Sequence, residues 1–222
     1  MHSVRLRGRE EPIAVGKIVC VGANYGRHVD EMGRRLEEPM LFLKPPTSLA
    51  RDGDSIPYPA FSTELHHELE MVLLIGEAGS SIAPERARGH IAGIAAGLDL
   101  TARDRQRRDM ERGFPWAVSK GFDGSAPVSE FVPLTGDLDP DDVRMALSVN
   151  GEARQRGSTA NMLLPCDRLV ALASRYFTLL PGDLIFTGTP EGVGPLQPGD
   201  ELEIELESLV SARFFIAPAA AR

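Results

Sequence analysis

Three carboxylates stand beside segments of the sequence that otherwise have the composition of a protein core. Glu68 and Glu70 are two residues apart and precede the apolar run at 71–75. On a β-strand this spacing places both side chains on one face, because successive side chains alternate between the faces of a sheet. Asp99 follows a second segment, 91–98, which contains only apolar residues and glycine. Carboxylates in such places repel one another and lose hydration, so they need a proton, a cation or a basic partner.

We interpret this trio as a site for a divalent cation. Mg²⁺ and Mn²⁺ bind oxygen ligands and keep coordination positions open for water or substrate. Glu68, Glu70 and Asp99 therefore predict a Mg²⁺ or Mn²⁺ site on two core strands. Each piece alone has another interpretation: a glutamate pair at strand spacing is common on a solvated face, and an aspartate after a glycine-rich strand is common in turns and as a helix N-cap. The prediction depends on the combination.

A histidine, a glutamate and a lysine could add acid–base chemistry. His28 and Glu31 are three residues apart on an expected short helix, 24–34, where the carboxylate can orient the imidazole as a general base for water. The same pair also fits an ordinary surface helix. Lys120 is the single cation of the mostly apolar segment 116–121. A partly buried lysine needs an anionic partner, which is either a structural carboxylate or a substrate anion.

The arginine-rich segment 103–108 raises the alternative of a nucleic-acid interface. Acidic residues such as Asp104 and Asp109 stand among these arginines, which is typical of a solvent-exposed helix with salt bridges. Arg103 differs, because it comes four residues after Asp99 and its guanidinium can bind a carboxylate through two hydrogen bonds. We therefore expect no nucleic-acid partner.

The segment 188–194 (GTPEGVG) is rich in glycine. It lacks the Lys-Ser/Thr pair of a P-loop, and the chain has no dinucleotide-binding fingerprint. We expect a rigid loop that offers backbone N–H groups and the Thr189 hydroxyl to an anion.

Composition limits the class of protein. The chain has 222 residues, 42% hydrophobic and 25% charged, which fits one globular domain spanning 1–222. The net charge of −8 argues against nucleic acid or an anionic membrane as partner. The two cysteines, Cys20 and Cys166, are too few for a disulfide scaffold and fit a reducing compartment. No apolar stretch resembles a signal peptide or a membrane span, so we expect a cytoplasmic protein.

The coarse pattern predicts many short strands and few helices, because 22 glycines and 17 prolines interrupt the chain often. The expected strands are 17–22, 40–43, 65–75, 91–101, 143–149, 184–187, 201–207 and 209–216. Besides 24–34, the expected helices are 84–88, 102–112 and 167–176. Asn150-Gly151 predicts a hairpin turn, and 217–222 a loose tail. The predicted class is α+β, mostly β, rather than an alternating βαβ fold.

With these segments placed, the chain resembles the fumarylacetoacetate hydrolase family over about residues 14–216. The matching segments, in family order, are 21–28 (VGANYGRH), 42–45 (FLKP), 67–70 (HELE), 99–106 (DLTARDRQ), 116–120 (WAVSK), 149–152 (VNGE), 181–183 (PGD), 188–190 (GTP) and 192–194 (GVG). The length resembles the short, single-domain branch that includes acylpyruvases and oxaloacetate decarboxylases.

The resemblance implies a rolled, mixed β-sheet core of the fumarylacetoacetase C-terminal type with short helices, and a homodimer. It also implies a role for nine residues. They are Glu68, Glu70 and Asp99 as Mg²⁺ or Mn²⁺ ligands, His28 and Glu31 as the water-activating dyad, Lys120 as the lysine that steadies an enolate, and Arg103, Gln106 and Thr189 near the carboxylate and carbonyl oxygens of the substrate.

The implied reaction is metal-dependent hydrolysis of the C–C bond of an acylpyruvate, a 2,4-dioxo acid such as fumarylpyruvate or acetylpyruvate. His28, oriented by Glu31, would activate the attacking water, and a pyruvate enolate would leave, stabilised by the metal and Lys120. The same site could decarboxylate oxaloacetate without water attack. With a larger pocket, set by loops such as 155–164, it could isomerise or decarboxylate a hydroxymuconate from aromatic breakdown, or dehydrate a sugar acid. A non-catalytic protein with a structural cation would leave His28, Arg103 and Lys120 without a role.

Overall fold

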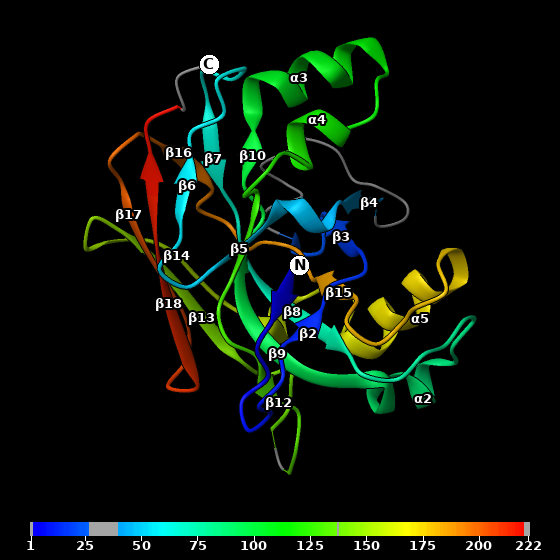
Figure 1. The fold of residues 1–222 in the computed structure, drawn as a ribbon. Helices are drawn as coiled ribbons and strands as arrows, with labels where there is room; N and C mark the ends of the chain where they lie inside the picture. The colour runs from blue at the N-terminus through cyan, green and yellow to red at the C-terminus, as the bar shows by residue number, and fades with distance from the viewer. Residues whose placement is uncertain (1, 27–39, 137, 220–222) are drawn as a thin grey trace.

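The computed structural model describes residues 2–26, 40–136 and 138–219, whose strands form a curled system of sheets with short helices around it (Figure 1). The largest sheet has eight strands. In hydrogen-bonded order they are β4 (Met40–Lys44), β3 (Ile18–Gly22), β15 (Leu184–Phe186), β8 (Leu69–Ile75), β9 (Ile91–Leu98), β11 (Ala126–Val128) and β5 (Leu49–Arg51), with β12 (Val132–Pro133) also paired to β9. The pairs β3–β15 and β5–β11 are parallel and the other pairs antiparallel, so the sheet is mixed, as predicted.

The long antiparallel pair β8–β9 forms the centre of the molecule (Figure 1). All seven residues of β8 are buried, which explains why the sequence shows an apolar run there instead of an alternating pattern. Pairing runs from Leu69 opposite Leu98 to Ile75 opposite Ile91. This register places the residues that precede β8 beside those that follow β9.

A second sheet of five strands packs against the first. Its order is β14 (Glu152–Ser158), β13 (Arg144–Val149), β17 (Glu201–Leu206), β18 (Val210–Ala217) and β6 (Ser55–Pro57). Burial alternates along β17 and β18, and their inward side chains share one hydrophobic cluster with β8. Asn150 and Gly151 join β13 to β14 with φ of 54° and 79°, the left-handed conformation that an Asn-Gly hairpin turn requires. The predicted hairpin is confirmed.

Smaller elements complete the fold. Two further sheets contain β10 (Thr101–Ala102), β7 (Leu65–His67) and β16 (Gly194–Leu196), and β1 (Ser3–Val4) with β2 (Ile13–Ala14). The helices α3 (Arg103–Arg112) and α4 (Ala117–Lys120) lie together, and α2 (Pro84–Ala87) packs against α5 (Cys166–Tyr176) on another side (Figure 1). Short 3₁₀ turns occupy Pro46–Ser48, Arg88–His90 and Thr159–Asn161. Among the described residues, no helix combines the length and apolarity that crossing a membrane requires.

The mostly-β prediction with short helices is confirmed. Most of the expected strands and helices occur within one or two residues of their predicted ends. The expected helix 24–34 falls almost entirely outside the described residues. Several strands of two or three residues, such as β5, β6 and β11, and the four-residue α4 were not expected, since such short pieces show no periodicity. The seven-residue β14 is an edge strand with a largely polar sequence, so it too lacks the apolar alternation of a half-buried strand.

Four boundary predictions are wrong. The expected strands 65–75 and 91–101 are each interrupted, the first at Glu68 and the second after Leu98. There the Asp99 N–H donates to the Glu68 carbonyl at 2.8 Å, and the chain on both sides leaves the large sheet for the small one that contains β7 and β10. Residues 155–158 belong to β14 instead of a loop, and Ala217 belongs to β18 instead of the tail.

Candidate metal centre

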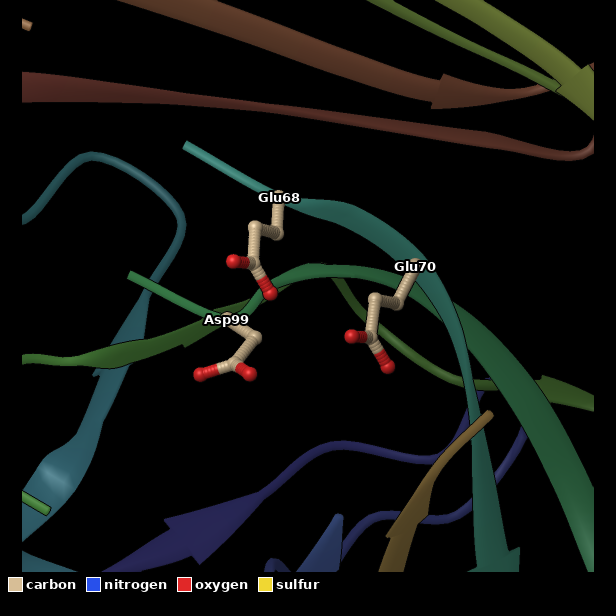
Figure 2. A group of neighbouring side chains, drawn as sticks. All are labelled: Glu68, Glu70 and Asp99. Atoms are coloured by element: carbon tan, nitrogen blue, oxygen red, sulfur yellow. The ribbon is translucent and has the colours of Figure 1, made fainter. Parts of the chain in front are cut away.

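The three carboxylates predicted as ligands are brought together by the β8–β9 pairing. Glu68 lies in the break before β8, Glu70 is the second residue of β8, opposite Gly97, and Asp99 follows β9. All three are buried, and each offers an oxygen that lies within 4.8 Å of the oxygens of the other two. Figure 2 shows the three side chains extending to the same side of the two strands.

Two cations predicted for the site contact these carboxylates. Lys120 Nζ, at the end of α4, lies 2.9 Å from Glu68 Oε2 and 2.5 Å from Asp99 Oδ2. It also lies 5.1 Å from the centre of the Phe42 ring, a cation–π distance. Arg103, the first residue of α3, pairs through Nη2 with Glu68 Oε1. Of the two options for Lys120, an anionic protein partner is therefore present.

A third buried cation, Lys44, was missed by sequence reasoning. Its Nζ lies 2.8 Å from Asp99 Oδ1 and donates hydrogen bonds to Ser125 O at 2.9 Å and to the carbonyl of Lys120. Lys44 ends an apolar strand, so the available signal was a single charge closing an apolar segment. That pattern more often describes a strand end in solvent, and only the packing of β4 shows that this lysine is buried.

The surroundings of Glu70 disfavour its charged form. Burial, and then the charges of Asp99 and Glu68, raise the pKa of Glu70 well above its ordinary value. A hydrogen bond of 2.7 Å from the Gly188 N–H to Glu70 Oε2 opposes this only partly. Burial alone would lower the pKa of Lys120, but the charges of Asp99 and Glu68 outweigh it and the pKa is raised. Lys120 is therefore held in its charged form, while the charged form of Glu70 stays unfavourable.

The donor set fits a hard divalent cation. It consists of three carboxylates that converge from one side, and a cation among them would relieve the repulsion that raises the pKa of Glu70. Asp99 Oδ1 lies 2.8 Å from Lys44 Nζ and Asp99 Oδ2 lies 2.5 Å from Lys120 Nζ. Because a carboxylate has about four lone-pair sites, these two contacts leave sites for a bond to a metal ion. A cavity of about 30 Å³ adjoins the cluster, and this space is enough for an ion or water.

The residues predicted to bind the substrate line the same cavity. Its lining includes Arg103, Gln106, Lys120 and Thr189 together with the three carboxylates. Arg103 Nη1 donates to Gln106 Oε1 at 2.6 Å, a contact allowed by their i, i+3 spacing on α3. A larger concavity of about 820 Å³ lies elsewhere, beside residues such as Arg5 and Ser211, and none of the predicted site residues lines it. His28 and Glu31 lie outside the described residues.

The glycine-rich loop 188–194 binds a protein carboxylate and also lines the cavity. The Gly188 N–H binds Glu70, and the φ of 99° at Gly188 favours glycine. A Cβ on Gly188 would lie 2.8 Å from Asn24 Cβ, so the loop approaches Asn24 too closely for a larger residue. The Asn24 amide donates to Thr187 O at 2.8 Å and to Leu164 O at 3.1 Å. Asn24 therefore ties three chain segments together.

This combination defines a class of protein: a curled mixed β-sheet protein with a buried cluster of carboxylates, lysines and an arginine suited to a divalent cation and an anionic ligand. The sequence profile of the fumarylacetoacetate (FAA) hydrolase C-terminal family matches residues 17–216. The chain belongs to this family, as its motifs indicated.

Two named relatives are oxaloacetate tautomerases. The mitochondrial oxaloacetate tautomerase FAHD1 of Mus musculus is 46% identical over 198 residues, which cover 89% of this chain and 90% of the relative. The oxaloacetate tautomerase YcgM of Escherichia coli K12 is 46% identical over 197 residues, or 87% of this chain and 89% of the relative.

Solved structures share the fold under other activity names. Fumarylpyruvate hydrolase from Pseudomonas aeruginosa, in complex with Mn²⁺ and pyruvate, superposes with a TM-score of 0.93 at 36% identity and covers 97% of this chain and 95% of its own. The 5-carboxymethyl-2-hydroxymuconate delta-isomerase of Mycobacterium smegmatis gives 0.84 at 39% identity, covering 95% and 82%. Hydrolases, isomerases and tautomerases therefore occur among the relatives, and the compounds in these names are small organic acids.

Proposed function

We propose that this protein interconverts the keto and enol forms of a small 2-oxo acid, with oxaloacetate as the substrate. The observation that carries the proposal is the contact of the Lys120 ammonium with Glu68 and Asp99 at a cavity that Arg103 and Gln106 also line. Such a site offers positive charge to bind a dianionic acid, and its fixed lysine can stabilise the enolate that develops during the reaction. The 46% identity to relatives named oxaloacetate tautomerase supports this substrate.

The carboxylate cluster supplies the place for a metal ion. Held by Glu68, Glu70 and Asp99, a Mg²⁺ or Mn²⁺ ion would act as a Lewis acid on the 2-oxo group and so acidify the neighbouring carbon.

The remaining residues bind the substrate and move its proton. Arg103 presents a planar guanidinium that can bind a substrate carboxylate, and Gln106 and Thr189 offer hydrogen bonds to the other oxygens. Lys120, which its carboxylate neighbours keep charged, stabilises negative charge on the enolate oxygen. His28, oriented by Glu31, is predicted from the sequence as a general base for water, and in this reaction it would accept and return the proton of the substrate carbon.

A second candidate is acylpyruvate hydrolysis, because the fumarylpyruvate hydrolase with Mn²⁺ and pyruvate has a TM-score of 0.93 with this chain. Both reactions pass through an enolate of a 2-oxo acid. They differ in whether His28 removes a carbon-bound proton or deprotonates a water. Decarboxylation of oxaloacetate would use the same enolate without either step.

One set of assays separates these reactions. Purified protein is given enol-oxaloacetate, and the loss of the enol absorbance is followed with Mg²⁺, with Mn²⁺ and with EDTA. Pyruvate release from oxaloacetate and loss of acetylpyruvate are followed in parallel. We expect chelator-sensitive tautomerisation to be the fastest reaction. Dominant acetylpyruvate cleavage would replace the proposal by the second candidate, and a metal-induced rise in melting temperature without a further rise with oxalate would favour a structural cation. The homodimer, the single domain and the cytoplasmic location stay predictions.

A further inference from the structure

Gln155 is the one buried residue of an otherwise exposed or half-exposed edge strand. In β14 the residues on either side of it are exposed, whereas Gln155 is only 1% exposed. A buried carboxamide is tolerated only when its donors and acceptors are satisfied. The contacts of Gln155 therefore indicate what holds it inside.

The carboxamide is fully used, and its orientation is determined. Oε1 accepts a hydrogen bond from the Leu69 N–H at 2.9 Å and lies 2.8 Å from His67 Nδ1. Nε2 donates to Thr189 Oγ1 at 2.9 Å and to Pro190 O at 3.1 Å. Because a backbone N–H can only donate and a carbonyl can only accept, the amide cannot be flipped. Oε1 is an acceptor, so His67 must carry its proton on Nδ1.

The partners of Gln155 adjoin the candidate metal centre. His67 and Leu69 are the chain neighbours of Glu68, at the break between β7 and β8. Thr189 lines the cavity and follows Gly188, whose N–H binds Glu70. One side chain thus links the backbone on both sides of Glu68 to the loop beside Glu70, and these segments lie more than a hundred residues apart in sequence.

We infer that Gln155 is a positioning residue that holds Glu68 and the loop 188–190 in the relative placement that ion and substrate binding require. The inference rests on the proposed use of this site for a divalent cation and a 2-oxo acid. Hydrogen bonds that orient metal ligands from outside typically contribute about 10–100-fold to metal affinity or activity.

The first test removes the hydrogen bonds of this carboxamide with Gln155→Met, which keeps nearly the same volume. We measure Mn²⁺ affinity by titration calorimetry without substrate, and the tautomer of His67 by ¹H–¹⁵N NMR. We expect Mn²⁺ binding about tenfold weaker or more, and loss of the Nδ1–H form that predominates in the unmodified protein. The matched control is Ser174→Ala in α5. It deletes the buried hydroxyl that accepts a hydrogen bond from the Ile82 N–H at 2.9 Å. We expect it to lower the melting temperature and leave both readouts unchanged.

A second variant separates the contacts of Oε1 from those of Nε2. It also provides the test if Gln155→Met does not fold. Gln155→Glu keeps an oxygen for Leu69 and His67 but places the other oxygen against the Pro190 carbonyl, where two acceptors repel each other. We expect the His67 tautomer to be kept and the affinity for oxalate, measured with saturating Mn²⁺, to fall about tenfold.

The outcomes distinguish this inference from the proposed function. Unchanged Mn²⁺ and oxalate affinities in the Gln155 variants, with only a lower melting temperature, would show a purely structural role and overturn the inference. If the variants lose affinity as expected and the unmodified protein turns over no 2-oxo acid, the proposed function fails and the positioning role stands. No Mn²⁺ binding by the unmodified protein would overturn both.

Discussion

Lys44 and Asp99 form an ion pair of 2.8 Å in which the two side chains are 0% and 2% exposed. The lysine comes from β4 and the aspartate follows β9, and three strands separate β4 from β9 in the large sheet. Lys44 also donates hydrogen bonds to carbonyls of Ser125 and Lys120. It therefore connects a candidate metal ligand to the end of the helix that carries the second lysine of the site.

Removal of this lysine should destabilise the fold strongly. Lys44→Met leaves Asp99 with one buried cation fewer and several carbonyls without their donor, and breaking a buried pair in this way costs about 3–5 kcal/mol. Urea unfolding with EDTA present measures the free energy of unfolding. Arg88→Met is the control, because the Arg88–Asp139 pair is 53% and 56% exposed and such pairs contribute at most about 1 kcal/mol. Equal losses in the two variants would contradict the importance of the buried pair.

Glu70→Gln should stabilise the protein at neutral pH when metal is chelated. Burial and the charges of Asp99 and Glu68 raise the pKa of Glu70, so the folded protein binds this proton more tightly than the unfolded chain does. Ionised Glu70 therefore lowers the free energy of unfolding, and the loss grows as pH rises from the unfolded pKa through the folded pKa. The variant should show a higher melting temperature in EDTA and a flatter dependence on pH from acidic to neutral conditions.

The same variant should lose its response to metal. Mn²⁺ should raise the melting temperature of the unmodified protein, because it binds the folded state, and should raise that of Glu70→Gln much less. If the variant were less stable than the parent in EDTA, the ionised Glu70 would not destabilise the fold. If both proteins responded equally to Mn²⁺, Glu70 would not be a metal ligand.

Lys120→Met should separate metal binding from catalysis. Loss of one preorganised charge that stabilises a developing oxyanion typically costs on the order of 10²–10³-fold in kcat. Mn²⁺ affinity should be equal or higher, because Glu68 and Asp99 lose a competing cation. Lys120→Arg should not restore the rate, since a planar guanidinium does not replace a compact ammonium. A rate within a few fold of the parent would remove Lys120 from the mechanism.

His28→Ala tests which reaction the site performs. As a general base, His28 should contribute about 10²–10⁴-fold to acylpyruvate hydrolysis and to tautomerisation, whereas decarboxylation of oxaloacetate should be affected far less. Metal binding, measured by Mn²⁺ titration, should survive in this variant. If all three activities were unchanged, the assignment of His28 from the sequence would be refuted, and a matching loss in Glu31→Gln would support the dyad.

Local chemistry made much of the candidate site predictable. Glu68, Glu70 and Asp99 were recognised because acids beside apolar segments are energetically costly, and that cost is visible in the sequence itself. The Asn150-Gly151 hairpin was recognised for a similar reason, since its left-handed φ angles favour these two residue types. Motif order placed Lys120, Arg103, Gln106 and Thr189 in the same family site, and the structure brings these four residues to one cavity.

Only the tertiary structure decided how these groups meet. The β8–β9 register places Asp99 beside Glu68, the strand breaks turn both carboxylates toward one space, and the packing of β4 and β14 buries Lys44 and Gln155. A lysine at a strand end and a glutamine in a polar edge strand are ordinary surface residues by sequence. Their burial depends on contacts with segments far away in the chain, and propensity and spacing within a short window carry no information about those contacts.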